Sequence, residues 1–217
     1  MVFGKIEYIN LLPFHVFMKR FTKGSSAKMS MAYKKDVPAK INSAFHSRRV
    51  DAAFISSISA QKSSNVGLGI IAKKDVQSVI VIPQENSLKD VESASSNVLA
   101  AILGLKGEVI IGDKALRYAL KNSNYIDLAK EWNKRHNLPF VFALLCFHKD
   151  KSLYKKIEKE FLKSPIKIPR YILQKTAQKT EIAESDILEY LKLISYKLDY
   201  KSQMGLKLFY KSSKTII

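Results

Sequence analysis

Short apolar runs alternate with segments of helical spacing over the first sixty residues. The run VFGKIEYI, at 2–9, stops at Asn10. A segment of helical spacing follows it, and its apolar face consists of Phe14, Phe17, Met18 and Phe21. This order predicts a strand, a turn and a helix.

Two more strands are expected in the same region, KMSMAYK at 28–34 and VDAAFIS at 50–56, with a helix between them. Strands that alternate with helices favour a parallel sheet. In such sheets, binding sites form just beyond the carboxyl ends of the strands.

The alternation breaks at VGLGIIAKK and VQSVIVIP, two strand candidates with no room for a helix between them. It resumes until LPFVFALLCFH, at 138–148, a long apolar strand that we place crossing back to the first lobe. Two lobes joined by two crossing strands would enclose a cleft. We therefore predict an α/β fold with a discontinuous lobe 1, residues 1–82 and 143–217, and a lobe 2, residues 83–142.

The C-terminal region is predicted to be helical. One helix in it carries an apolar stripe made of Ile187, Leu188, Leu191, Ile194 and Leu198. We interpret this stripe as a face that packs on the core, without a role in cofactor binding.

The net charge of the chain excludes few classes of binding partner. The chain has 37 Lys and Arg against 19 Asp and Glu, a net charge of +18 that would suit nucleic acid, an anionic membrane or a small anionic substrate. Most basic residues are lysines on the expected solvated faces of helices, as in DKSLYKKIEKEFLK at 150–163. Because no nucleic-acid-binding signature accompanies them, we expect a lysine-rich surface and no nucleic-acid partner.

The composition is that of a chain with a real core, since 47% of its 217 residues are hydrophobic. Cys146 is the single cysteine, which excludes an intrachain disulfide and a cysteine-based metal cluster. The sequence shows no cleavable signal pattern, and no apolar run approaches the ~18 residues of a membrane span. We expect a soluble, cytoplasmic protein with no membrane partner.

Polar residues follow the predicted strands at the level where a cleft would open. Asn10 ends the first strand, and Ser56 and Ser57 follow the third. If a helix starts near Leu11, its amide N–H groups and positive dipole end would suit an anion, which the Asn10 carboxamide could orient. For each of these stretches taken alone, a simple helix cap is the more economical interpretation.

Two further serine positions are candidates of the same kind. Ser78 lies at a strand start near the predicted crossover, where turn chemistry is the ordinary explanation. SASSN, at 93–97, places Ser93, Ser95 and Ser96 before a helix. Such hydroxyls, together with helix N–H groups, form either a receptor for a carboxylate or phosphate or an ordinary N-cap.

The remaining polar residues are interpreted as structural. Asp113, in IGDKAL, is most economically a helix N-cap in the cleft wall. The four histidines lack metal-ligand spacing, and the chain has no Walker loop, Rossmann fingerprint or nucleophile elbow. We therefore predict no metal and no cofactor.

Seven stretches of the chain, taken in order, form a recognisable set. They are EYINLLPF (7–14), DVPAKIN (36–42), VDAAFISSIS (50–59), SVIVI (78–82), SASS (93–96), IIGDKAL (110–116) and YIDLAKEWNKRHNLPFVFAL (125–144). Together they resemble the chorismate dehydratase family of the futalosine route to menaquinone. The closing segment at 188–211 fits as well, so the resemblance covers nearly the whole chain.

The resemblance implies a two-lobed fold like that of a type II periplasmic binding protein. It also implies a carbon–oxygen lyase that removes water from chorismate to give 3-[(1-carboxyvinyl)oxy]benzoate without a cofactor. Matched motif by motif, the implied catalytic residues are Asn10 and Ser78. The implied substrate-binding residues are Ser56, Ser57, Ser93, Ser95 and Ser96, with Ser95 in place of the usual threonine.

The reaction that the resemblance implies makes the chorismate ring aromatic, so the enzyme must chiefly hold geometry and stabilise charge. Loss of the hydrogen beside the ether places negative charge on the ring carboxylate. We expect the SASS or SSIS hydroxyls to bind that carboxylate, and Asn10 and Ser78 to orient the ether and the departing hydroxyl. Since no motif position offers a carboxylate or histidine as base, the expected proton acceptor is the substrate's own side-chain carboxylate.

Two other functions stay open. A non-catalytic protein that binds a small anion would share the fold, although such proteins are usually exported and no signal peptide is visible. The related 1,4-dihydroxy-6-naphthoate synthase has a Cys-Pro-Asn-Asp type motif where this chain has Ile-Asn-Leu-Leu-Pro. The oligomeric state stays open too.

Overall fold

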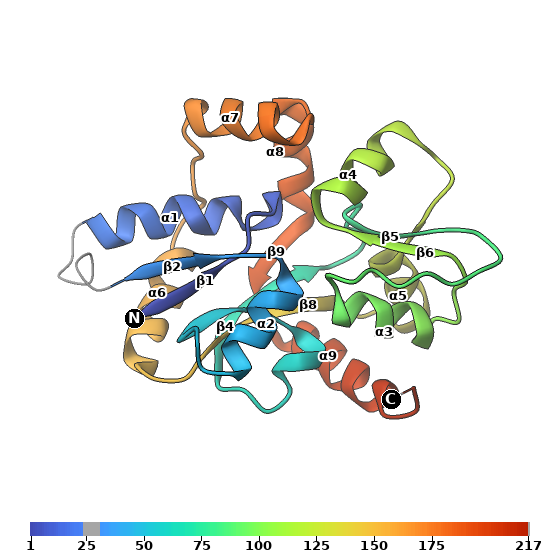
Figure 1. Ribbon diagram of the computed structural model, residues 1–217, viewed down its shortest axis with the longest axis horizontal. Coiled ribbons are helices and arrows are strands. Elements are labelled where there is room, and N and C mark those ends of the chain that lie inside the picture. Colours follow the sequence, from blue (N-terminus) through green and yellow to red (C-terminus); the bar gives the residue numbers. More distant parts are fainter. Residues whose placement is uncertain (24–30, 217) are drawn as a thin grey trace.

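The computed structural model describes residues 1–23 and 31–216 (Figure 1). Its strands are β1 (Val2–Lys5), β2 (Ala32–Lys35), β3 (Ala52–Ser56), β4 (Asn65–Ala72), β5 (Val79–Ile82), β6 (Glu108–Ile111), β7 (Ile126–Asp127), β8 (Phe140–Phe147) and β9 (Ile194–Lys197). Its α-helices are α1 (Leu12–Lys23), α2 (Pro38–His46), α3 (Ala94–Ile102), α4 (Gly112–Lys121), α5 (Leu128–His136), α6 (Lys151–Leu162), α7 (Arg170–Thr180), α8 (Glu184–Leu193) and α9 (Tyr200–Ser213). The short 3₁₀ helices η1 (Ile9–Leu11) and η3 (Ser57–Ala60) follow β1 and β3.

The strands form two sheets, which confirms the α/β class with two lobes. The larger sheet has the order β2-β1-β3-β8-β4-β9 and the smaller one the order β6-β5-β7. β1 pairs in parallel with β2 and β3, as the strand–helix alternation predicts. β8 then runs antiparallel between β3 and β4. Of the second predicted strand, residues 28–30 lie outside the described residues, and the pairing covers Ala32–Lys35.

The chain passes between the two sheets at residues 73–78 and 137–139, and these segments are irregular, so the expected crossing strands are wrong. Asp127 organises the first crossing, because its Oδ2 accepts the backbone N–H groups of Val76 (2.8 Å) and Gln77 (2.7 Å). Because the Asp127 carboxylate already accepts these two backbone N–H groups, the segment does not need to pair with a neighbouring strand. β5 therefore begins in the smaller sheet and β8 in the larger one. The exact residue limits of the lobes stay a prediction.

The predicted apolar face of α1 packs into the main core. Phe14 is fully buried, with its ring centroid 4.9 Å from that of Phe54 and 5.3 Å from that of Phe161. Burial of a large apolar side chain stabilises the fold by roughly 1.5–3 kcal/mol, so these rings hold α1 and α6 against the larger sheet. Below that sheet in Figure 1, α9 packs on β8 and reaches α3 of the smaller lobe.

The single C-terminal helix predicted through Leu198 is wrong. α8 ends at Leu193, and Ile194–Lys197 forms β9, which pairs antiparallel with the edge of β4. Leu188, expected on a core face, is 44% exposed. The open edge of β4 offers main-chain partners, and the isoleucine and tyrosine of β9 suit a strand, so pairing prevails over helix continuation.

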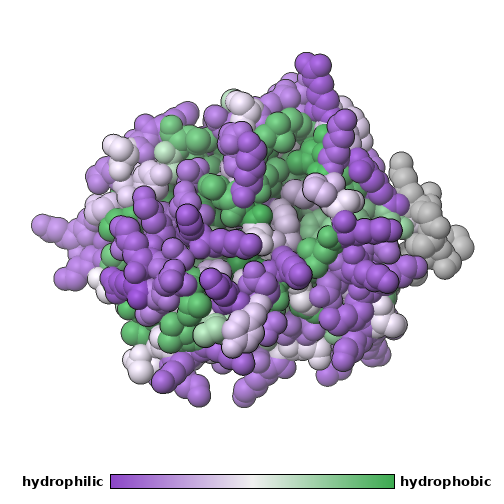
Figure 2. All heavy atoms as spheres, turned by 180° about the vertical axis from the view of Figure 1, so that it is seen from behind, coloured by the Kyte–Doolittle hydropathy of each residue, from purple (hydrophilic) through white to green (hydrophobic). Residues whose placement is uncertain are grey.

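Hydrophilic side chains cover much of the rear face, with apolar side chains between them (Figure 2). On α6, for example, Lys155 and Lys156 are exposed while Tyr154 and Ile157 are buried. This arrangement matches the predicted lysine-rich surface. Within the described part of the chain, no helix combines the length and the apolar character needed to cross a membrane.

Candidate active site

A cavity of about 70 Å³ lies between the larger and the smaller sheet. Its polar lining consists of Tyr8, Asn10, Ser56, Ser78, Ser93 and Ser96, and its other described lining residues are apolar or glycine. No charged side chain is among the described residues that line it. The volume accommodates several waters, and five of the seven predicted site residues meet in it.

Several helices begin at this cavity. Its lining includes Leu11 just before α1, Pro38 at the start of α2, Ser56 just before η3, Ser93 and Ser96 at the start of α3, and Gly112 at the start of α4. The first N–H groups of a helix have no intrahelical partner, and the dipole makes that end positive. The cavity therefore favours an anion without a lysine or arginine in its wall.

Asn10 is held in place through its backbone and its neighbour. Its carbonyl oxygen accepts a hydrogen bond of 2.7 Å from the Tyr196 hydroxyl. The adjacent Ile9 N–H donates to Asp113 Oδ1 at 3.0 Å. The predicted N-cap role of Asp113 is wrong, because the N-cap of α4 is Ile111. The Asp113 carboxylate instead accepts an N–H from the other lobe, and burial raises its pKa.

Ser78 is 1% exposed and precedes β5. Its backbone N–H donates to the Val76 carbonyl at 2.7 Å, and its carbonyl accepts from Gly112 N–H at 2.8 Å. Its Oγ accepts a hydrogen bond of 2.8 Å from the Tyr190 hydroxyl. These contacts fix the serine at the meeting point of the crossing segment, α4 and α8.

Ser56 is oriented by Asn42, which sequence reasoning did not single out. Asn42 Nδ2 donates to Ser56 Oγ at 2.8 Å, and Asn42 Oδ1 accepts from the Ser56 N–H at 3.1 Å. Asn42 is buried beside the apolar residues Ile41 and Phe45 of α2. The sequence did contain a sign of this role, because Asn42 is a polar residue on the apolar face of the helix predicted between the second and third strands.

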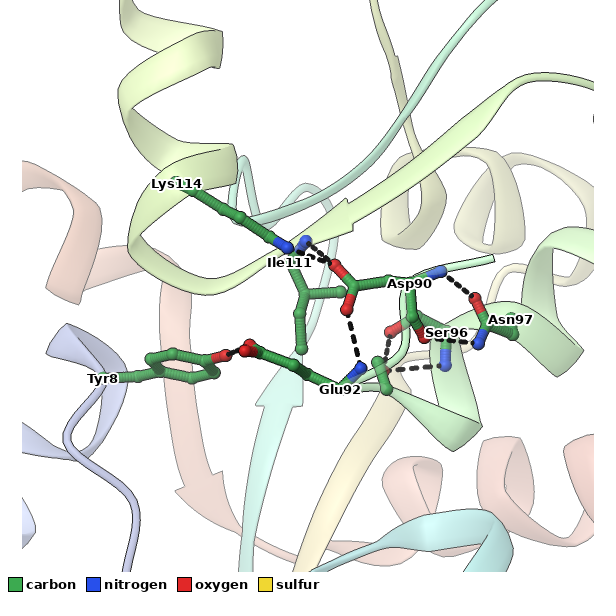
Figure 3. Close-up of polar contacts among 8 residues, drawn as sticks. Tyr8, Asp90, Glu92, Ser96, Asn97, Ile111 and Lys114 are labelled. Atoms are coloured by element: carbon green, nitrogen blue, oxygen red, sulfur yellow. Dashed lines mark hydrogen bonds and ion pairs between the residues drawn. The ribbon is translucent and has the colours of Figure 1, made fainter. Parts of the chain in front are cut away.

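Ser93 and Ser96 form the start of α3. Ser93 is its N-cap, with Oγ accepting from the Ser96 N–H at 3.3 Å and donating to Ser96 Oγ at 2.7 Å. The buried Asp90 carboxylate shapes the preceding loop (Figure 3) by accepting from the Glu92 N–H at 2.8 Å and from Lys114 Nζ at 2.8 Å. Sequence reasoning missed Asp90, since its partner Lys114 comes from another helix.

Comparisons with known proteins identify the family of this chain. A family model described as menaquinone biosynthesis matches residues 91–215. A chorismate dehydratase of Campylobacter jejuni is 46% identical over 220 residues, which cover 100% of this chain and 99% of that relative. The chain belongs to the menaquinone biosynthesis family. The resemblance found in the sequence is thus confirmed for the family.

Solved structures show which fold this menaquinone biosynthesis protein has. A protein of Archaeoglobus fulgidus matches with a TM-score of 0.67 at 9% identity, over 99% of this chain and 97% of that one. The periplasmic aliphatic sulphonate binding protein SsuA of Escherichia coli matches with a TM-score of 0.58 at 13% identity, over 100% of this chain and 88% of that one. The predicted likeness to a periplasmic binding protein is confirmed for the fold.

Two of the predicted substrate-binding residues of this family member, Ser57 and Ser95, are not among the residues that line the cavity. Their Oγ atoms hydrogen-bond each other at 3.0 Å, and Ser95 Oγ also accepts from the Ile58 N–H at 3.1 Å. Both side chains are buried. They join η3 of one lobe to α3 of the other, next to Ser56 and Ser96.

Tyr8 forms a wall of the cavity and was not predicted, although it belongs to the EYINLLPF motif. Its ring packs on Gly112, where an added Cβ would lie 2.7 Å from the ring. Its hydroxyl donates to Glu92 (Figure 3). Burial, and then this carboxylate, raise the pKa of Tyr8, so the phenol stays protonated at neutral pH.

Proposed function

We propose that the protein is a chorismate dehydratase, a hydro-lyase of the futalosine route to menaquinone with chorismate as its small-molecule substrate. The observation that carries the proposal is the uncharged cavity in which Asn10, Ser56, Ser78, Ser93 and Ser96 meet at helix starts. Full-length identity of 46% to a chorismate dehydratase supports it. The chemistry of the wall also fits this substrate, since helix starts and hydroxyls suit carboxylates and the apolar lining suits a neutral ring.

In this proposal the start of α3 receives the ring carboxylate, through Ser96 and the N–H groups of the first helical turn. Asn10 and Ser78, across the cavity, orient the ether oxygen and the departing hydroxyl. Fixed donors of this kind act strongly where water is excluded, because they need no reorganisation as charge develops. Ser57 and Ser95, which bond to each other, act by holding Ser56 and Ser96 in position.

The elimination balances without an added reagent. The C–H bond beside the ether breaks, its electron pair completes the aromatic ring, and the C–O bond of the hydroxyl breaks. The hydroxide that leaves combines with the proton that was removed, giving water. We propose that the side-chain carboxylate of the substrate takes the proton first, because the described cavity lining holds no carboxylate or histidine.

The test is to incubate the purified chain with chorismate and follow the aromatic product by absorbance and mass, beside an incubation without protein. We expect a product lighter than chorismate by one water. Binding of chorismate without conversion would refute the proposal in favour of a non-catalytic anion-binding protein. Absence of both binding and conversion would refute it as well.

A further inference from the structure

Tyr190 lies behind the two predicted catalytic residues, in a helix interpreted from the sequence as a core element. It belongs to α8, is 3% exposed, and is not among the residues that line the cavity. Its hydroxyl is 2.8 Å from Ser78 Oγ. The Asn10 side chain lies near enough to this phenol to lower its pKa. One buried hydroxyl thus bonds to Ser78 and lies near Asn10.

The phenol keeps its proton at neutral pH. Burial is the largest influence on Tyr190 and raises its pKa, outweighing the neighbouring Ser78 and Asn10 side chains, which lower it. A protonated phenol beside Ser78 can donate a hydrogen bond permanently. In the observed pairing Tyr190 is the donor and Ser78 Oγ the acceptor.

The direction of this bond decides what Ser78 can offer a ligand. A serine hydroxyl has one hydrogen to donate and two lone pairs to accept with. When Tyr190 occupies a lone pair of Ser78 Oγ, the Ser78 hydrogen is left to point elsewhere, and Ser78 lines the cavity. Donation by Ser78 to Tyr190 would instead leave only lone pairs toward the cavity.

We propose that Tyr190 is a positioning residue that makes Ser78 a hydrogen-bond donor toward the departing hydroxyl of the substrate. The inference rests on the proposed function, because it assigns a direction to one contact of that reaction. A donor stabilises the hydroxide that develops as the C–O bond breaks. A lone pair aimed at the same oxygen would repel it.

The experiment is a double-mutant cycle of Tyr190→Phe and Ser78→Ala, with kcat and KM for chorismate measured separately. Tyr190→Phe keeps the ring and removes the hydroxyl. We expect kcat to fall about 10-fold in the otherwise unchanged chain, the effect of losing about one hydrogen bond, with KM changed less than about 2-fold. In the Ser78→Ala chain, which has no hydroxyl to orient, we expect the same substitution to change kcat less than about 2-fold.

Tyr154→Phe is the matched control. Tyr154 is also buried, at 1% exposed, but its hydroxyl donates to Met1 Sδ at 3.1 Å, and it is not among the cavity-lining residues. The kcat of the Tyr154→Phe variant should stay within about 2-fold of that of the unsubstituted chain. If kcat falls equally in Tyr190→Phe and Tyr154→Phe, the loss is a general effect of removing a buried tyrosine hydroxyl. That result would overturn the inference.

Other outcomes are equally decisive. Unchanged kcat in Tyr190→Phe, or equal losses with and without Ser78, would overturn the inference while the proposed function stands. Failure of the unsubstituted chain to convert chorismate would be a failure of the proposed function itself. If Tyr190→Phe does not fold, Ser78→Cys replaces it. A thiol is a weak donor, so kcat should fall at least about 10-fold, and unchanged kcat would overturn the inference.

Discussion

Tyr8 separates two hollows of opposite character. On one side lies the uncharged cavity of about 70 Å³ described above. On the other lies a groove of about 670 Å³ between α1 and α7, which we call the lysine groove. Its lysine, carboxylate and histidine lining consists of Lys5, Glu7, His15, Lys19, Lys35, Asp113, Lys175 and Lys179. By size and charge the groove would be the obvious site for an anion.

The contacts reverse that expectation. Glu7 already occupies the groove, with carboxylate oxygens 3.2 Å from Lys5 Nζ, 3.3 Å from Lys35 Nζ and 3.1 Å from Lys179 Nζ. Solvent-exposed ion pairs of this kind contribute little free energy and are screened by salt. The cavity instead offers several helix starts and hydroxyls held by hydrogen bonds, with no charged side chain among its described lining residues. The number of lysines in a hollow is therefore a poor guide to where an anion binds here.

The largest expected effect is a pH dependence of the free energy of unfolding, caused by a histidine in the lysine groove. His15 is half-buried there, and its Nε2 lies 2.8 Å from the Ile6 carbonyl oxygen. Burial, as the main cause, lowers the pKa of His15 from 6.5 to about 4. The native state then binds fewer protons than the unfolded state between these values, so stability is full above about pH 6.5 and falls as the pH drops toward 4. We expect a loss of about 3 kcal/mol over that range.

Urea unfolding of the natural chain and of His15→Gln at several pH values checks this expectation. The variant should lose most of the pH dependence. His136→Gln is the control, because the pKa of His136 is lowered too but this residue belongs to α5 and is not among the residues that line the groove. The same pH dependence in His15→Gln as in the natural chain would contradict the assignment.

The second effect tests the cavity wall. Gly112 has φ +70°, and a Cβ there would lie 2.7 Å from the Tyr8 ring. We expect Gly112→Ala to lower the free energy of unfolding by about 2 kcal/mol, from strain and the clash together, and to lower kcat several-fold because Tyr8 is displaced.

Gly104→Ala is the control for backbone strain in that experiment. Gly104 has φ +63° but nothing within 4 Å of an added Cβ. It should destabilise the chain by about 1 kcal/mol and leave kcat unchanged. If the two glycine variants have equal kcat, Tyr8 is not a wall that the reaction depends on.

The third effect tests the cavity's hydrogen-bonding groups. Asn10→Ala and Ser78→Ala should each lower kcat for chorismate at least about 10-fold, or about 1.4 kcal/mol, since each removes a fixed hydrogen-bonding group. Ser43→Ala, at an exposed position of α2, should have the rate of the natural chain. Rates within 2-fold of the natural chain in both cavity variants would remove these residues from the mechanism.

The smallest effect returns to the lysine groove. Lys35→Ala and Lys175→Ala, measured at about 0.15 M salt, should change kcat/KM less than 2-fold, because exposed charges are largely screened there. A 10-fold rise in KM in either variant would make the groove part of the substrate's route. The anion would then bind through both hollows and not through the uncharged cavity alone.

Much of the fold and the site could be predicted from local patterns. Apolar spacing indicated the strand and helix around Asn10, and serines at a helix start indicated the SASS turn before α3. Neighbouring serines could not be told apart, however. Ser56 and Ser96 line the cavity, while Ser57 and Ser95 bond to each other, because the direction of each side chain depends on how η3 and α3 pack together.

The sequence by itself determined the strand–helix order of the first sixty residues, the lysine-rich exterior and the chain positions at which donors could gather, since these depend on neighbours a few residues apart. Only the tertiary structure decided which distant residues hydrogen-bond to one another. Tyr190 reaches Ser78 across 112 residues, and Asp113 accepts from Ile9 across 104. The strand β9 exists because the edge of β4 was open to it. Contacts between distant residues depend on how whole elements pack, and no local pattern encodes them.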